Sequence, residues 1–278
     1  MGFDSSPKAI GILDSGVGGL TVAKEIMRQL PKERMIYFGD TARCPYGPRS
    51  PEEVRQFTDE IVAFLTRFPL KALVIACNTA TAVALGKVRE WLSIPVFGVV
   101  DPGARAAIKA SSQGRIGVIG TEGTVRSEAY EGALKRIDPH LFVVSLACPT
   151  LVPLVESGEG DTKRARRIVR QALAPIKQYD LDTLILGCTH YPLISDLIRR
   201  EMGPDVTLIS SAEETAREIS TVLHHKGLLH LSDAVDHGHR FYTTGHPGAF
   251  RRIAEQWLNQ EVEVEQVALE PAVQNPIG

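Results

Sequence analysis

Two cysteines stand in the same local context in the two halves of the chain. Cys77 lies in the segment VIACNT at 74–79, and Cys188 lies in the segment ILGCTH at 185–190. Each segment is an apolar run of strand type followed by a small residue, the cysteine and two polar side chains. A cysteine at the start of a helix is favoured as the thiolate, which can take up a proton. Two thiols presented alike to one substrate could exchange a proton between its two faces, so the pair predicts a two-base enzyme.

Short apolar segments alternate with amphipathic segments along most of the chain. This alternation predicts parallel sheets covered by helices, in which strand ends open into the crevice where such sheets bind ligands. The two cysteines are therefore expected in that crevice. The predicted strands are 10–13, 35–38, 73–76, 96–100, 116–119, 142–146, 184–186, 206–209 and 261–265. The predicted helices are 20–30, 51–68, 80–91, 127–137, 163–178 and 213–223.

The two halves also resemble each other outside the cysteine segments. The segment GILDS at 11–15 is similar to GVIGT at 117–121, and Cys44-Pro45 is similar to Cys148-Pro149. These pairs occur in the same order as the cysteine pair, so we interpret the chain as an ancient duplication. The predicted fold class is α/β, with two similar parallel-sheet domains. The first domain is expected at 1–98 plus 210–278, with the C-terminal segment returning to it, and the second at 99–209.

Composition narrows the class of protein. With 278 residues, 44% of them hydrophobic, the chain can bury a substantial core, and its net charge of −2 lacks the basic footprint of a nucleic-acid binder. No apolar run approaches the roughly 18 residues of a membrane span, and no signal peptide is recognised. Four cysteines without a Cys-x-x-Cys motif indicate reduced thiols. We therefore expect a cytoplasmic protein with a small-molecule substrate, and no direct binding to nucleic acid or membrane.

No cofactor or metal is expected. The histidines between 224 and 246 match no zinc-binding spacing, and no motif indicates a Schiff-base lysine for pyridoxal phosphate. The glycine-rich segment DSGVGGL at 14–20 is not a dinucleotide fingerprint, because Thr21 stands where the third glycine belongs. Its glycines still allow backbone N–H groups to approach an anion at a helix start, with Asp14 and Ser15 beside them. A plain tight turn is the alternative interpretation.

Three further features are weaker signals. The turn-rich loop at 38–48 would suit a lid over a small polar ligand, although an ordinary structured loop also explains it. His190 could assist proton movement at Cys188, or be a structural histidine. Glu156 could be a site carboxylate or a solvated residue at a helix end. Cys44 and Cys148 lack the context of the other two cysteines, so we interpret them as structural.

Four motifs in order resemble the cofactor-independent glutamate racemases of the aspartate/glutamate racemase family. They are DSGVGG at 14–19, GDTARCPYG at 39–47, ACNTA at 76–80 and GCTHYP at 187–192, and the resemblance runs from about residue 8 to at least 258. It implies two α/β domains related by a pseudo-twofold axis, with the active site in the interdomain cleft. It also implies a homodimer that supplies D-glutamate to peptidoglycan, and contact with DNA gyrase as in some relatives.

The resemblance also implies roles for individual residues. Cys77 acts on D-glutamate and Cys188 on L-glutamate, Asp14 sits beside the first thiol, and Glu156 and His190 assist the second. The substrate contacts that it implies are Asp14, Ser15, Tyr46, Gly47, Asn78, Thr79, Thr189 and His190, and the repeat adds Thr121.

Other functions remain open from the sequence. Aspartate racemases, hydantoin racemases and malonate-type decarboxylases use a similar scaffold, and a regulatory binding protein is the alternative from a different class. A redox or cysteine-hydrolase role has no supporting motif.

Overall fold

The computed structural model describes residues 8–230 and 238–270, and within them the strands form two sheets, with every strand pair parallel. The first sheet has six strands in the order β10-β9-β2-β1-β3-β4. Its strands are β1 Ala9–Asp14, β2 Met35–Gly39, β3 Leu70–Ile75, β4 Val96–Gly98, β9 Arg240–Thr243 and β10 Val264–Gln266. The burial of β1 to β4 on both faces matches the near-continuous apolar runs in their sequences.

The second sheet repeats the strand order of the first. It has four strands in the order β6-β5-β7-β8, which corresponds to β2-β1-β3-β4. Its strands are β5 Arg115–Gly120, β6 Phe142–Ala147, β7 Thr183–Gly187 and β8 Thr207–Ser210. The two similar sequence segments occupy β1 and β5, and each of the paired cysteines follows the strand beside one of them. The structure thus gives Cys77 and Cys188 equivalent positions.

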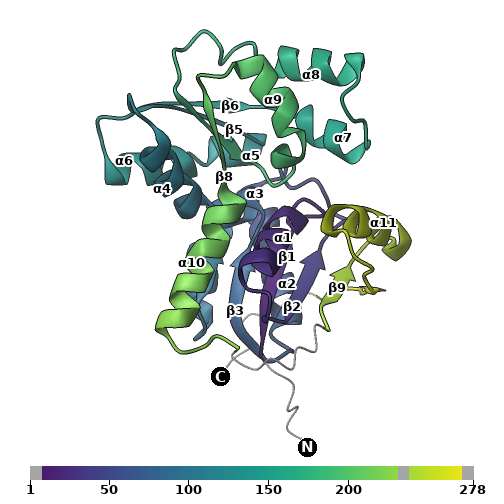
Figure 1. The fold of residues 1–278 in the computed structure, drawn as a ribbon. Coiled ribbons are helices and arrows are strands. Elements are labelled where there is room, and N and C mark those ends of the chain that lie inside the picture. The colour runs from purple at the N-terminus through teal and green to yellow at the C-terminus, as the bar shows by residue number, and fades with distance from the viewer. Residues whose placement is uncertain (1–7, 231–237, 271–278) are drawn as a thin grey trace, which may run out of the picture.

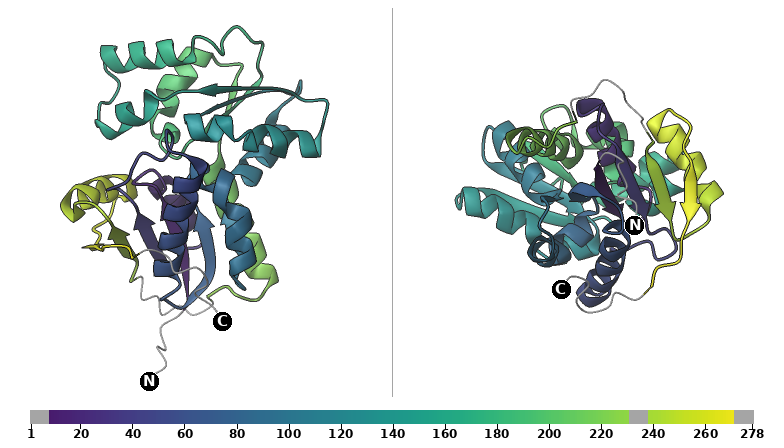
Figure 2. Two further views of the ribbon diagram at one scale, coloured as in Figure 1. Left: turned by 180° about the vertical axis from the view of Figure 1, so that it is seen from behind. Right: turned by 90° about the horizontal axis from the view of Figure 1, so that it is seen from below.

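Helices cover both faces of each sheet. In Figure 1 the second sheet and its helices lie above the first, and Figure 2 shows the same two-part division from behind. The helix α10 follows β8 and packs against α1 and α4. None of the helices in the described parts of the chain is long and apolar enough to cross a membrane. The helices are α1 Leu20–Gln29, α2 Pro51–Leu65, α3 Asn78–Trp91, α4 Val100–Ala110, α5 Glu122–Arg126, α6 Ala129–Ile137, α7 Leu151–Glu156, α8 Lys163–Leu173, α9 Ser195–Met202, α10 Ser211–His225 and α11 Pro247–Leu258.

A buried ion pair ties the segment after α10 to the first sheet. Lys71 Nζ lies 2.6 Å from Glu33 Oε2, and both side chains are almost fully buried. Lys71 also donates to the carbonyl of Leu228 at 2.8 Å, and the N–H of His230 donates to Glu33 Oε1 at 2.8 Å. From this point the chain goes on to β9, which pairs with β2. The charged pair therefore anchors the return of the C-terminal segment.

The predicted fold class is confirmed: two parallel-sheet α/β domains. The nine predicted strands and six predicted helices all occur, with shifted ends. The sequence analysis missed α4, α5, α7, α9, β9 and α11. Proline or glycine interrupts the helical pattern of most of these helices, and β9 directly follows a polar stretch, so each carries a weak local signal. The domain boundaries at 98/99 and 209/210 stay a prediction.

Candidate active site

A small cavity at the carboxyl ends of both sheets contains the two predicted thiols in its wall. Cys77 follows β3 of the first sheet, and Cys188 follows β7 of the second. The cavity measures about 20 Å³, which is room for about one water molecule. Its wall consists of Ser15, Cys44, Pro45, Tyr46, Gly47, Cys77, Asn78, Thr79, Thr121, Val152, Cys188, Thr189 and His190.

Cys77 sits at the N-cap of α3, as its sequence context predicts. Burial nevertheless raises the pKa of its thiol to about 12, and the nearby Asp14 carboxylate adds to the increase. Hydrogen bonds from the Ala80 N–H and the Ser15 side chain act in the opposite direction but are weaker. The expectation that the helix start favours the thiolate is therefore wrong for the closed cavity, because desolvation of the charged sulfur outweighs the helix end.

Cys188 is not followed directly by an α-helix. A polar turn and a short 3-10 helix, η1 Tyr191–Ile194, separate it from α9, so the predicted helix start at this cysteine is wrong. A histidine replaces the helix end as the electrostatic partner. His190 Nδ1 lies 3.8 Å from Cys188 Sγ, and His190 Nε2 lies 3.2 Å from Glu156 Oε1.

His190 is the charged group closest to the second thiol. Burial by itself lowers the pKa of this imidazole, but hydrogen bonds to Cys188 and Glu156 raise it overall to about 10. The hydrogen bond from His190 in turn lowers the pKa of Glu156. Imidazolium and carboxylate therefore form a charged pair at neutral pH. A cation beside Cys188 stabilises negative charge on that sulfur.

Asp14 and Glu156 do not line the inner cavity. Asp14 is fully buried behind it, where its Oδ2 accepts the N–H of Gly16 at 2.9 Å. Burial raises the pKa of Asp14, and the nearby His190 counteracts part of that increase. Glu156 lines an adjoining outer pocket of about 330 Å³, next to Gly16, Phe250 and His246. Asp14 thus acts electrostatically on Cys77 from behind the wall, Glu156 contacts His190 and Cys44, and the other ten predicted residues line the wall.

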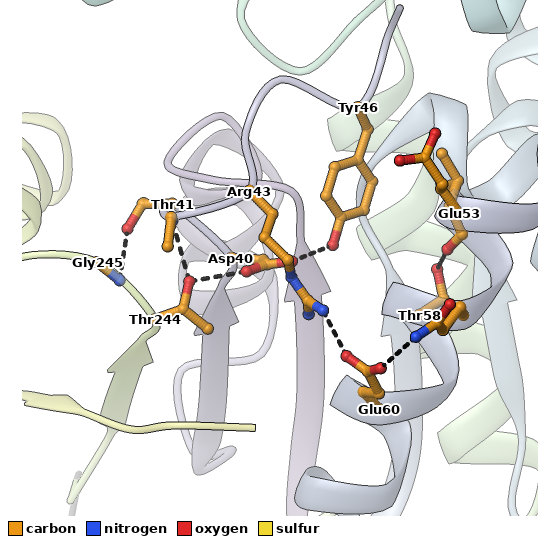
Figure 3. Close-up of polar contacts among 12 residues, drawn as sticks. Asp40, Thr41, Arg43, Tyr46, Glu53, Thr58, Glu60, Thr244 and Gly245 are labelled. Carbon is orange, nitrogen blue, oxygen red and sulfur yellow. Dashed lines mark hydrogen bonds and ion pairs between the residues drawn. The ribbon is translucent and has the colours of Figure 1, made fainter. Parts of the chain in front are cut away.

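The loop at 40–48 is held to the first sheet by a polar network (Figure 3). Asp40 accepts hydrogen bonds from Tyr46 Oη at 2.5 Å, Arg43 Nε at 2.7 Å and Thr244 Oγ1 at 2.7 Å. Arg43 also pairs with Glu60 on α2. Since its hydroxyl is used by Asp40, Tyr46 offers the cavity its ring and backbone.

The same loop contacts the second domain. The carbonyl of Gly47 accepts the N–H of Gly123 on α5 at 2.8 Å. Beside it, the hydroxyl of Thr79 lies 2.9 Å from that of Thr121 and 3.3 Å from that of Thr124. These contacts join α3 of the first domain to α5 of the second, so both domains fix the position of the predicted substrate contacts Gly47, Thr79 and Thr121.

Gly18 of the first domain packs tightly against Thr189 and His190, the two residues that follow the second thiol. A Cβ at Gly18 would overlap Thr189 Oγ1 and lie 2.7 Å from His190 Cε1. We expect Gly18→Ala to lower kcat/KM by about tenfold to hundredfold, since overpacking costs about 1–3 kcal/mol. Steady-state kinetics measure the loss. Gly86→Ala is the matched control, because nothing lies within 4 Å of the added methyl group. Equal activity of the two variants would contradict the close fit.

The sequence analysis missed four side chains at the site: Cys44, Pro45, Val152 and Tyr130. Cys44, interpreted above as structural, lies in the cavity wall and in the outer pocket, and its Sγ is 3.7 Å from Glu156 Oε1. Burial raises the pKa of this thiol. The available sequence signal was the position of Cys44 between Arg43 and Pro45 in the turn-rich loop at 38–48. Cys148 is buried, contacts the carbonyls of Leu146 and Ala172, and is not part of the cavity wall.

Cavity size alone does not identify the site. A larger hollow of about 550 Å³ lies beside β9, β10 and α11, and none of the predicted residues lines it. None of the described histidines between 224 and 246 lines the inner cavity. His246 caps α11 through its Nδ1 and lines the outer pocket, and His237 lies outside the described residues. Residues 8–230 and 238–270 contain no group of three or more side chains arranged to hold a metal ion.

Two parallel-sheet α/β domains with one thiol from each in a single cavity at their strand ends match the arrangement expected of an amino-acid racemase. The Asp/Glu/hydantoin racemase family profile matches residues 10–219, which is most of the chain. The chain belongs to this family.

Within the family, the chain groups with the glutamate racemases. It is 56% identical to the glutamate racemase of Bacillus cereus over 256 residues, which is 92% of this chain and 95% of that protein. A crystal structure of a glutamate racemase isoform from Bacillus anthracis superposes with a TM-score of 0.91 at 58% identity, covering 94% of this chain and 98% of the other. The glutamate racemase of Francisella tularensis in complex with D-glutamate superposes with a TM-score of 0.88 at 34% identity, with coverage of 95% and 98%.

Proposed function

We propose that this protein interconverts L-glutamate and D-glutamate, with Cys77 and Cys188 as the two bases. The observation that carries the proposal is that equivalent strands of two similar sheets deliver one thiol each to a single cavity. The Francisella tularensis relative, crystallised with D-glutamate, supports glutamate as the substrate. Cys77 acts on D-glutamate and Cys188 acts on L-glutamate.

In each turnover one cysteine starts as thiolate and the other as thiol. The thiolate removes the α-proton of glutamate and becomes a thiol, and the electron pair of the broken C–H bond stays on the substrate. The opposite thiol then delivers its proton to the other face of the α-carbon and becomes a thiolate. The configuration is inverted and no net proton is consumed. The two thiols therefore exchange protonation states in each turnover, and no cofactor takes part.

The α-proton is far less acidic than a thiol, so the site has to stabilise the developing carbanion. Preorganised N–H and hydroxyl donors on the substrate carboxylate do this best in a dry cavity. Asn78, Thr79 and Thr189 supply such donors from the wall. The raised pKa of the Cys77 thiol also makes its thiolate a stronger base once it forms.

Glutamate enters only when the cavity widens, because a volume of about 20 Å³ holds no more than a water molecule. The loop at 40–48 and the Gly18 contact with His190 are the places where the two domains meet over the cavity. We infer that the domains part to admit substrate and close on it, which excludes water during the proton transfer.

Circular dichroism of each pure enantiomer tests the proposal. The purified protein, in D2O with a reducing agent and a chelator, is incubated separately with L-glutamate and D-glutamate. Decay of both signals to zero, with deuterium entering the α-position, is the expected result. Turnover of aspartate or a hydantoin, with glutamate unchanged, would contradict the substrate assignment and leave the racemase class intact.

The charge on His190 predicts an alkaline limit to the activity. Because its pKa is raised to about 10, the imidazolium is present at neutral pH and is lost as the pH rises through about 10. We expect kcat for L-glutamate to fall in that range. In Glu156→Gln the fall in kcat begins at lower pH, because the carboxylate that helps to raise the pKa of His190 has been removed. Glu159→Gln, whose side chain pairs with Arg164, is the control. If kcat fell over the same alkaline pH range in the wild type and both variants, this role of His190 and Glu156 would be refuted.

We further propose that the D-glutamate formed supplies peptidoglycan synthesis, and that the active protein is a homodimer in the cytoplasm. Contact with DNA gyrase stays a prediction as well. Light scattering of the purified chain at several concentrations tests the dimer. Growth of a depleted strain with and without added D-glutamate tests the biological role: rescue is expected, and failure to rescue would contradict it.

A further inference from the structure

Tyr130 and Asn78 form a buried hydrogen bond between the two domains. Asn78 is the first residue of α3, directly after Cys77, and Tyr130 belongs to α6 of the second domain. The phenol of Tyr130 donates to Asn78 Oδ1 at 2.7 Å, and each residue is only 2% exposed. The sequence analysis gave Tyr130 no role.

The other end of the same amide has no partner. Asn78 Nδ2 is buried and makes no hydrogen bond to any residue that the structure describes. A buried donor left unpaired costs about 1–3 kcal/mol, so such groups in native proteins call for an explanation. Asn78 lines the cavity. Because Tyr130 holds Oδ1, the NH2 group is the part of the amide left for a ligand.

Two neighbours fix the phenol itself. Burial raises the pKa of Tyr130, while a hydrogen bond from the Ser211 side chain at the start of α10 acts in the opposite direction. The phenol proton points to Asn78 Oδ1. On another side, a Cβ at Gly103 of α4 would lie 3.3 Å from Tyr130 Oη, so the backbone of α4 packs closely against it. Residues of α10 and α4 thus surround the phenol that donates to Asn78.

We propose that Tyr130 is a positioning residue that turns the Asn78 amide so that its NH2 group donates to a carboxylate of the substrate. The inference rests on the proposed function, since glutamate offers two carboxylates and one ammonium group. An NH2 group can bind only the carboxylates. The reversed amide would present its oxygen and bind the ammonium group instead. The orientation that Tyr130 selects therefore decides which part of the substrate lies against Asn78.

Steady-state kinetics in both directions test the proposal through a double-mutant cycle. Asn78→Ala is expected to raise KM about tenfold or more, since a hydrogen bond to a charged group contributes about 1.5–3 kcal/mol. Tyr130→Phe removes only the hydroxyl, and is expected to raise KM about threefold to tenfold with a smaller change in kcat. In the Asn78→Ala background, Tyr130→Phe should have no further effect on KM.

Asn78→Asp tests the orientation directly. Aspartate has the same shape, and its second oxygen would replace the NH2 group and repel a substrate carboxylate. KM is therefore expected to rise more than in Asn78→Ala. A KM at or below the wild-type value would mean that the amide oxygen faces the ammonium group, and would overturn the inference. Ser211→Ala, which removes the donor to the phenol, should raise KM less than Tyr130→Phe.

Tyr191→Phe is the matched control. Tyr191 is also fully buried, and its hydroxyl donates to the carbonyls of Gly120 at 3.1 Å and Cys148 at 3.0 Å. Removal of this hydroxyl should lower the free energy of unfolding. Any effect of Tyr191→Phe on KM should add to the effect of Asn78→Ala when the two changes are combined. If the Tyr130→Phe effect adds in the same way, Tyr130 is merely structural. If a variant binds glutamate without turning it over, Kd values from calorimetry replace KM in these comparisons. An unaltered chain that neither binds nor racemises glutamate overturns the proposed function, and this inference with it.

Discussion

Cys77→Ala and Cys188→Ala are each expected to lower kcat at least about 10³-fold in both directions, because each enantiomer needs one thiol to remove the proton and the other to return it. The Kd for glutamate should change only a few-fold, since the substrate donors Asn78, Thr79 and Thr189 stay in place. Circular dichroism measures the first effect and calorimetry the second.

The remaining thiol gives a more specific signature. Cys77→Ala retains Cys188, so it should still exchange the α-proton of L-glutamate for deuterium slowly and with retention of configuration. Cys188→Ala should do the same with D-glutamate. Proton NMR in D2O follows both reactions. Cys148→Ala, which removes a buried thiol outside the cavity wall, is the control and should keep its activity. Racemisation near the wild-type rate by either single variant would refute the two-base mechanism.

Lys71→Met is expected to destabilise the protein by about 3–5 kcal/mol, because it leaves the Glu33 carboxylate buried and unpaired. Lys71 and Glu33 are 6% and 3% exposed, so water cannot replace the lost partner. The carbonyl of Leu228 loses a donor as well. Urea unfolding followed by tryptophan fluorescence measures the shift in the transition midpoint.

Two further variants separate charge from packing. Lys71→Met combined with Glu33→Leu replaces the pair with apolar side chains and should recover most of the loss, since buried pairs contribute little net stability. Lys135→Met breaks the exposed pair with Glu131 and should cost less than about 1 kcal/mol. A Lys71→Met midpoint equal to that of Lys135→Met would contradict the importance of the buried pair.

Several site features could be predicted from the sequence because they depend on local chain pattern. Apolar runs followed by a small residue, a cysteine and polar side chains predicted two strand ends, and the parallel sheets bring these ends to one cavity. The glycines of the segment at 14–19 predicted an approach of backbone N–H groups to an anion, which stays a prediction, and Gly18 packs against Thr189 and His190 of the second domain. Ten of the twelve residues predicted from the cysteine pattern, the repeat and the family resemblance line the cavity.

Contacts between segments that are distant along the chain had no local signal. Tyr130 lies 52 positions from Asn78, and Cys44 lies 112 positions from Glu156, so only the docking of the two domains brings each pair together. No chain periodicity encodes such contacts. α4 and α11 were missed because proline and glycine near their starts weaken the helical pattern, while burial against the sheets stabilises them.

The sequence by itself therefore determined the fold class, the duplication and the two thiols, since these follow from hydrophobic periodicity and repeated segments. The tertiary structure alone decided the electrostatics of the site. Burial raises the pKa of Cys77 although the helix end favours the thiolate. The Glu156 carboxylate helps to keep His190 charged beside Cys188. Desolvation and charge pairing depend on groups that are distant along the chain, and only the folded structure specifies how deeply each is buried.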